Sequence, residues 1–170
     1  MTAPLVLLYH HIGDSIQDQN SVSPEEFRLQ MRFLKRYAEV ITLREFESLY
    51  PGKGGKGKVL ITFDDGYEDV YANAIPILKE MGFHAAFFIN PGLVGTHDDW
   101  NPKTPQRYKH MDQDQLETIR RGGFEIQDHG FDHMNIRKKK KDYIIDDIRR
   151  SREWFNAAFG EEPYAFAYPF

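Results

Sequence analysis

Short apolar runs alternate with helical patterns along this chain of 170 residues, and that alternation restricts its fold more than any other feature. The predicted strands lie at residues 4–9, 58–63, 84–89 and 124–127. The run at residues 4–9 is typical of a strand that is buried on both faces. Strands that alternate with helices on short connections form a parallel sheet. The sequence therefore predicts an α/β fold.

Capping signals and periodicity place the helices between these strands. Ser23 and Glu26 form a predicted capping box at the start of one helix, and Asp112 is expected to cap a second helix that runs to about Arg121. Further helices are predicted at residues 43–50, 67–81 and 142–159, with short strands at residues 40–42 and 164–168. The residues expected to face inward are Phe27, Met31 and Leu34 in the first helix, and Ile144, Ile145, Ile148 and Phe155 in the last.

Composition limits both the size of the fold and its partners. Hydrophobic residues make up 41% and aromatic residues 14%, which is enough for one domain over residues 1–170 with a buried core. The formal net charge of −4 argues against nucleic acid as a partner. No apolar run reaches the roughly 20 residues of a membrane span, and the N-terminal residues are not expected to act as a secretion signal. The chain is also shorter than the about 250 residues of a complete eightfold barrel.

Polar side chains follow three of the predicted strands: His10 and His11, then Asp64 and Asp65, then the loop with His129 and His133. In parallel α/β folds the functional site lies at the carboxyl ends of the strands. Two adjacent carboxylates cannot both be buried unpaired, because each such charge costs several kcal/mol, so one of them is expected to bind a cation. Because the chain has no cysteine, the ligands of any metal must be His, Asp or Glu.

Simpler interpretations of these residues remain open at this point. An Asp-Asp pair after a strand is also typical of a plain turn or a helix cap, and a His pair of a solvated loop. His10 could be a histidine at the edge of the core, and His11 is the weaker catalytic candidate. His84, His97 and His110 are interpreted as structural or surface residues.

Three motifs together resemble a known family. They are Thr62-Phe-Asp-Asp-Gly66, His129-Gly-Phe-Asp-His133 and Phe166-Ala-Tyr-Pro-Phe170. They resemble the polysaccharide deacetylases, also called the NodB-homology domain or carbohydrate esterase family 4. The segment Leu8-Tyr-His-His-Ile12 is similar to the circularly permuted branch that acts on poly-N-acetylglucosamine. The resemblance implies a distorted, incomplete (β/α) barrel with parallel strands, and metal-dependent removal of N-acetyl groups from a polysaccharide.

The resemblance also implies roles for particular residues. Asp65, His129 and His133 would bind a divalent metal, which is expected to be zinc, with nickel, cobalt or iron as alternatives. Asp64 would be the general base, His10 the general acid, and the backbone N–H of Tyr67 an oxyanion donor. Tyr67, Trp100 and Tyr168 are the predicted substrate-binding residues. An extracytoplasmic or cell-wall location follows from the family alone.

The sequence departs from the family pattern at two positions near the site. Asp128 stands where many members have Ser, and it is expected either to orient a histidine or to compete as a ligand. Ala167 stands where many members have an Arg that steers the base. The family continues with further strands after the position of Phe170, which predicts an open barrel edge there. A catalytically impaired metal- and carbohydrate-binding module, or a deacetylase of chitin oligomers or peptidoglycan, are the alternative functions.

Overall fold

A computed structural model describes residues 2–14, 19–49, 54–97 and 108–170. The strands are β1 (Leu5–Tyr9), β2 (His11–Ile12), β3 (Ser21–Val22), β4 (Glu39–Ile41), β5 (Lys58–Phe63), β6 (Ala86–Ile89) and β7 (Glu125–Asp128). The α-helices are α1 (Pro24–Tyr37), α2 (Leu43–Leu49), α3 (Glu68–Met81), α4 (Gln113–Arg121) and α5 (Lys141–Phe159), with short 3₁₀ helices η1 (Pro91–Leu93) and η2 (Ile136–Lys138). The predicted α/β class is confirmed.

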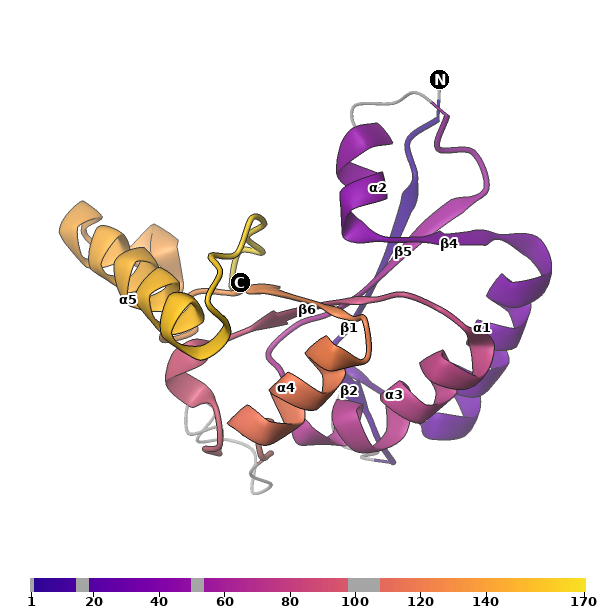
Figure 1. The fold of residues 1–170 in the computed structure, drawn as a ribbon, viewed down its shortest axis with the longest axis horizontal. Helices are drawn as coiled ribbons and strands as arrows, with labels where there is room; N and C mark the ends of the chain where they lie inside the picture. The colour runs from indigo at the N-terminus through magenta and orange to yellow at the C-terminus, as the bar shows by residue number, and fades with distance from the viewer. Residues whose placement is uncertain (1, 15–18, 50–53, 98–107) are drawn as a thin grey trace.

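The main sheet is parallel throughout and has the order β1-β5-β6-β7 (Figure 1). The fifth strand, β4, pairs with the first half of β5, and β6 pairs with its second half. Parallel pairing follows from the helices that carry the chain back between successive strands. The carboxyl ends of the strands, which bear the predicted site residues, therefore all lie on the same side of the sheet.

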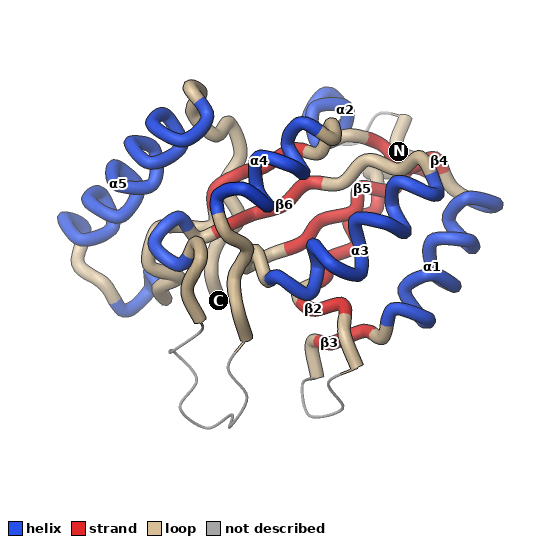
Figure 2. Tube along the Cα trace, turned by 60° about the horizontal axis from the view of Figure 1, so that its bottom comes forward, coloured by secondary structure: helices blue, strands red, loops and turns tan. Residues whose placement is uncertain are grey.

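Each face of the sheet has its own apolar cluster. Val59, Ile61 and Phe63 point to the larger cluster, which α1, α3 and α4 complete. Leu60 points to a smaller cluster that includes residues of α2 and the C-terminal segment. Figure 2 shows α1, α3 and α4 on one side of the strands, and α5 at the opposite end of the molecule from α1. Successive side chains of a strand point to opposite faces of the sheet. A strand that is covered on both faces, such as β5, therefore supplies apolar residues to both clusters.

The predicted helix starts are confirmed in detail. Ser23 caps α1 and forms a complete capping box with Glu26, and Asp112 caps α4 in the same way with Gln115. The inward positions Phe27, Met31 and Leu34 are buried. Local capping and periodicity thus determine these two helices.

The burial predicted for the first strand is wrong. Leu5, Val6 and Leu8 of β1 are exposed, and only Tyr9 is buried. Among the described strands β1 pairs with β5 alone, so it lies at the edge of the sheet. An apolar run predicts a strand, but it does not predict the position of that strand in the sheet.

The strand predicted at residues 164–168 is wrong as well, since only Phe166 forms a bridge, to Asp128 of β7. The backbone N–H groups of Tyr164 and Ala165 both donate to the side-chain Oε1 of Gln127, each at 3.0 Å, rather than to a neighbouring backbone. Pro169 follows directly and has no N–H to donate. The segment therefore lies beside β7 without forming a regular ladder.

The inward face predicted for the last helix is partly wrong. Phe155 of α5 is buried, but Ile145 and Ile148 are exposed. Two polar residues, Asp147 and Ser151, occupy the buried positions instead. The reason lies in the contacts that these two side chains make with the candidate site.

Candidate metal centre

Strand register brings the predicted residues together. Tyr9 is level with Phe63 in the β1–β5 ladder, so His10 lies beside Asp64. Ile89 is level with Asp128 in the β6–β7 ladder, and His129 follows directly. The carboxyl ends of β1, β5 and β7 thus place His10, Asp64, Asp65 and His129 around one point, as the sequence predicted.

The turn at residues 64–66 is fixed by backbone hydrogen bonds. Asp64 N donates to the Tyr9 carbonyl at 3.0 Å, and Met111 N donates to the Gly66 carbonyl at 2.9 Å. Asp65 has φ +70°, in the left-handed region that few residues other than glycine and Asn or Asp adopt. Of the two adjacent carboxylates, Asp65 lies closer to the histidines: its Oδ1 is within 3.4 Å of both, whereas Asp64 Oδ2 lies 4.0 Å from His129 Nε2.

Asp65, His129 and His133 form a group that could hold a metal ion. Asp65 Oδ1 lies 3.0 Å from His133 Nε2 and 3.4 Å from His129 Nε2, and the three ligand atoms all lie within 4.8 Å of one another. Ligands bound at about 2.0 to 2.2 Å to one tetrahedral ion lie roughly 3.3 to 3.6 Å apart. The two distances from Asp65 are therefore close to those between ligands of such an ion.

The protonation of His129 fits the same interpretation. Its Nδ1 lies 3.0 Å from the carbonyl oxygen of Ala167. Because a carbonyl can only accept, Nδ1 carries a proton, and Nε2 is the atom directed at Asp65. Metal-binding histidines commonly donate their second ring N–H to a carbonyl in this way, which fixes the ring and its tautomer. Ala167, at the position where many family members have Arg, thus contributes its backbone carbonyl oxygen to the site.

The two carboxylates have opposite electrostatic environments. Burial raises the pKa of Asp64, and the nearby histidines oppose that shift only in part. Burial also acts on Asp65, but its contacts with His10, His129 and His133 outweigh burial and hold its pKa well below the usual range. Asp65 is therefore the permanent anion of the pair, and Asp64 is the better proton acceptor.

The candidate acid His10 contacts the candidate metal ligand Asp65 directly. Its Nδ1 lies 2.9 Å from Asp65 Oδ2, and its side chain is partly exposed. His11 has a different environment: it is buried, its Nδ1 lies 2.9 Å from Asp69 Oδ2, and its ring stacks on Tyr67. Of the two adjacent histidines, His10 is thus the one at the site.

The predicted substrate-binding residues are distributed unevenly. Tyr67 is buried, with its ring between His11 and His110, and it is the N-cap residue of α3. Tyr168 is exposed near the C-terminus. Trp100 lies outside the described residues, so its position relative to the site stays a prediction.

Two further residues at the site were not assigned to it from the sequence. Asn90, directly after β6, is buried and donates from Nδ2 to the carbonyls of His129 and Gly130, each at 2.8 Å. His110 is buried, as the structural interpretation expected, and its Nδ1 donates to the Asp65 carbonyl at 2.9 Å. The position of Asn90 directly after a predicted strand is a signal that could have identified it, whereas no local signal marks His110.

The fold and the site define a parallel α/β domain with an Asp-His-His group that could hold a metal ion at the carboxyl ends of its strands. Residues 51–170 match the sequence profile of the polysaccharide deacetylases. The chain belongs to the polysaccharide deacetylase family. The resemblance stated from the three motifs is confirmed.

The sequence and structural similarities to individual proteins are consistent with membership of this family. A poly-beta-1,6-N-acetyl-D-glucosamine N-deacetylase of Staphylococcus aureus is 33% identical across 88% of this chain and 53% of its own length. The structure of IcaB from Ammonifex degensii has a TM-score of 0.83 and 26% identity, over 99% of this chain and 75% of that chain. The Streptococcus pyogenes deacetylase PplD, with a TM-score of 0.81, 22% identity and coverage of 99% and 74%, shares the fold. The chain spans about half the length of the curated relatives it matches.

Proposed function

We propose that this chain is a metal-dependent N-deacetylase that hydrolyses the acetamido group of N-acetylglucosamine units in a poly-β-1,6-linked polysaccharide. The observation that carries the proposal is that Asp64 and His10 lie beside the group formed by Asp65, His129 and His133. All of these residues are at or after the carboxyl ends of the strands. The sequence similarity to a poly-beta-1,6-N-acetyl-D-glucosamine N-deacetylase supports the choice of substrate. An extracytoplasmic location at the cell wall or biofilm matrix fits that substrate.

Asp65, His129 and His133 would hold the cation, with zinc as the expected ion. When bound, the cation polarises the amide carbonyl and lowers the pKa of a water molecule. Two imidazoles and one carboxylate leave a coordination position open, which is typical of catalytic rather than structural sites. Nickel, cobalt or iron would suit the same ligands.

Asp64 acts as the general base. Its Oδ2 lies 4.0 Å from His129 Nε2, which places it beside the metal ligands without being one of the three. Because burial raises its pKa, Asp64 is a stronger base than a solvated aspartate. It takes a proton from the attacking water as the oxygen of that water bonds to the amide carbon.

His10 gives a proton to the leaving nitrogen as the carbon–nitrogen bond breaks, so that the products are acetate and a glucosamine amine. Its contact through Nδ1 with Asp65 makes Nε2 the atom that transfers the proton. The backbone N–H of Tyr67, at the start of α3, donates to the oxygen that becomes negative during the attack. Tyr168 and Trp100 are the proposed sugar contacts.

The test measures acetate release and metal content together in wild type, Asp64→Asn and His129→Ala. We expect Asp64→Asn to keep stoichiometric metal and to lose about 10²- to 10⁴-fold in rate, because it removes the base alone. His129→Ala should lose both metal and activity. Wild type and His129→Ala with equal metal content would refute the metal site.

The substrates separate the alternative functions. β-1,6-linked N-acetylglucosamine oligomers should release acetate faster than chitin oligomers or peptidoglycan fragments. Faster release from either of the other two would assign a different polysaccharide to the same site. A wild type that holds metal and binds the oligomers but releases no acetate would identify a carbohydrate-binding module instead.

A further inference from the structure

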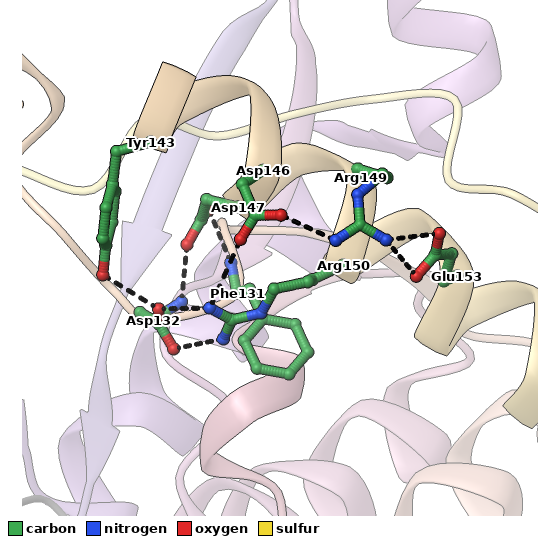
Figure 3. A network of polar contacts seen from close by, with 8 residues as sticks. All are labelled: Phe131, Asp132, Tyr143, Asp146, Asp147, Arg149, Arg150 and Glu153. Atoms are coloured by element: carbon green, nitrogen blue, oxygen red, sulfur yellow. Dashed lines mark hydrogen bonds and ion pairs between the residues drawn. The ribbon is translucent and has the colours of Figure 1, made fainter. Parts of the chain in front are cut away.

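The loop between the two metal-binding histidines is held by a carboxylate from α5 (Figure 3). Asp147 Oδ2 accepts a hydrogen bond from Phe131 N at 2.9 Å, and its Oδ1 accepts one from Asp132 N at 3.0 Å. These two consecutive amides lie between His129 and His133 in the sequence. Asp147 is buried, with 3% exposure, whereas the loop residues that donate to it are half-buried.

A second contact from the same helix holds the outer side of the loop. Arg150 donates to both carboxylate oxygens of Asp132, at 2.8 and 2.9 Å, and its guanidinium lies 3.9 Å from the centre of the Phe131 ring. Tyr143 Oη also donates to Asp132. Bidentate arginine–carboxylate pairs fix orientation as well as distance. Figure 3 shows these side chains of α5 gathered on the side that faces the loop.

A third contact anchors the start of the loop. Ser151 Oγ donates to Asp128 Oδ1 at 2.6 Å, and the same oxygen accepts from Gly130 N at 2.8 Å. Asp128 is therefore engaged with the backbone and α5, and it is not one of the three grouped ligands. Of the two roles expected for Asp128, this contact agrees with that of a supporting residue.

The backbone of the loop needs such support. His133 has φ +48°, a conformation that costs a residue with a Cβ roughly 1 to 2 kcal/mol and persists only where the surroundings enforce it. A buried carboxylate is also unfavourable unless its oxygens accept hydrogen bonds. Asp147 and the strained loop therefore stabilise each other, and the consequence is that His133 Nε2 lies 3.0 Å from Asp65 Oδ1.

We infer that Asp147 is a positioning residue for the metal centre: it holds the 129–133 loop in the one conformation in which both histidines face Asp65. Arg150 assists by holding Asp132 and Phe131. The inference rests on the proposed function only in taking Asp65, His129 and His133 as metal ligands. It predicts that α5, which contributes no ligand among the described residues, sets the affinity of the site.

Asp147→Asn tests this inference, with Asp146→Asn as the matched control. The asparagine keeps the size of the side chain but offers one acceptor oxygen, so its NH₂ group must face one of the two loop amides. Asp146 is the neighbouring carboxylate on α5, is exposed, and pairs with Arg149 at 2.6 Å and Arg150 at 4.0 Å without touching the loop backbone. Both substitutions remove the same charge.

The measurement is the zinc dissociation constant by competition with a chelating dye, beside urea unfolding of the metal-free proteins. We expect Asp147→Asn to bind zinc about 10- to 100-fold more weakly than wild type, and Asp146→Asn to match wild type. A role in folding alone would lower the stability of metal-free Asp147→Asn without changing the zinc affinity of its folded form. Equal zinc affinity of folded Asp147→Asn and wild type would overturn the inference.

Two further outcomes are decisive. If Asp147→Asn does not fold, Arg150→Gln takes its place: the side chain is partly exposed, and we expect a several-fold loss of zinc affinity. Unchanged affinity in that variant overturns the inference. A wild type that binds no zinc, nickel, cobalt or iron overturns the metal site of the proposed function and the inference with it, whereas a failure of the inference alone leaves wild-type binding intact.

Discussion

At the scale of the residue, His110 shows how a buried side chain supports the site without being a candidate ligand. Its ring stacks on Tyr67, and its Nδ1 donates to the carbonyl of Asp65. Burial lowers the pKa of His110 to about 4, from an ordinary value of 6.5. The folded protein therefore keeps His110 neutral at pH values where the unfolded chain has already bound a proton.

The depressed pKa of His110 predicts a loss of stability in acid. Above pH 6.5 neither state protonates this ring. Between pH 6.5 and about 4 only the unfolded state binds the proton, so the free energy of unfolding falls by about 3 kcal/mol, at about 1.4 kcal/mol per pKa unit. Below about pH 4 this contribution no longer changes.

Urea unfolding of metal-free wild type and His110→Gln across pH 4 to 7 measures that contribution. The advantage of wild type over the variant should shrink as the pH falls, because glutamine does not titrate. A difference between the two proteins that stays constant over this range would contradict the assignment, since the ring would then titrate alike in both states.

Residue patterns indicated the candidate site residues better than the residues that support them. Asp64, Asp65, His129 and His133 follow strand ends of a parallel sheet, and two adjacent carboxylates cannot both be buried unpaired, so the sequence predicted that they lie at one site. Asp147 was not predicted to lie there, since a carboxylate in a helix full of charges ordinarily faces solvent. Its two hydrogen-bond donors come from a loop at least 15 positions earlier in the chain, and only the folded structure brings them together.

At the scale of the element, α3 is bracketed by two glycines in the left-handed region, Gly66 with φ +72° and Gly82 with φ +65°. Gly66 completes the turn that follows Asp65, and Gly82 is the C-cap. Their surroundings differ. A Cβ on Gly66 would lie 3.0 Å from Ile89 Cγ2, whereas a Cβ on Gly82 would meet no atom within 4 Å.

Alanine at each glycine separates backbone strain from crowding. We expect Gly82→Ala to lower the free energy of unfolding by about 1 to 2 kcal/mol through strain alone. Gly66→Ala should cost more, because Ile89 must also move, and it should weaken zinc binding because the turn carries Asp65. Urea unfolding and zinc competition provide the two measurements. Equal costs with equal zinc affinity would show that the turn at Gly66 has room for a side chain.

Local signals predicted elements well where the cause is local. The capping boxes of α1 and α4 are contained within four residues each; the sequence predicted the first box in full and the Asp112 cap of the second. The exposure of β1 and the loss of a regular strand around Phe166 depend on distant partners, namely the edge of the sheet and the Gln127 side chain. Periodicity carries no information about either partner.

At the scale of the whole molecule, the main sheet of the described residues is parallel and open, with β1 at one side and β7 at the other, while β2 and β3 form a separate pair. An apolar groove lies between β1 and α1. Its lining includes Leu5, Leu8, Leu29 and Phe33, which are all exposed. None of the helices among the described residues has the length and apolar composition of a membrane span.

An exposed, apolar edge strand is a site where a second strand can pair. We expect this 170-residue chain to associate with itself in a concentration-dependent manner through β1, where backbone groups on the open side lack a neighbouring strand among the described residues. Leu8→Lys should suppress that association, because a lysine at an edge disfavours pairing while its exposed position leaves the core intact.

Ile145→Lys on α5 is the matched control, since Leu8 is 52% exposed and Ile145 53%. Sedimentation velocity of the three proteins over a range of concentrations distinguishes the two surfaces. Suppression by Ile145→Lys rather than Leu8→Lys would assign the contact to α5, and equal association of all three proteins would exclude both surfaces.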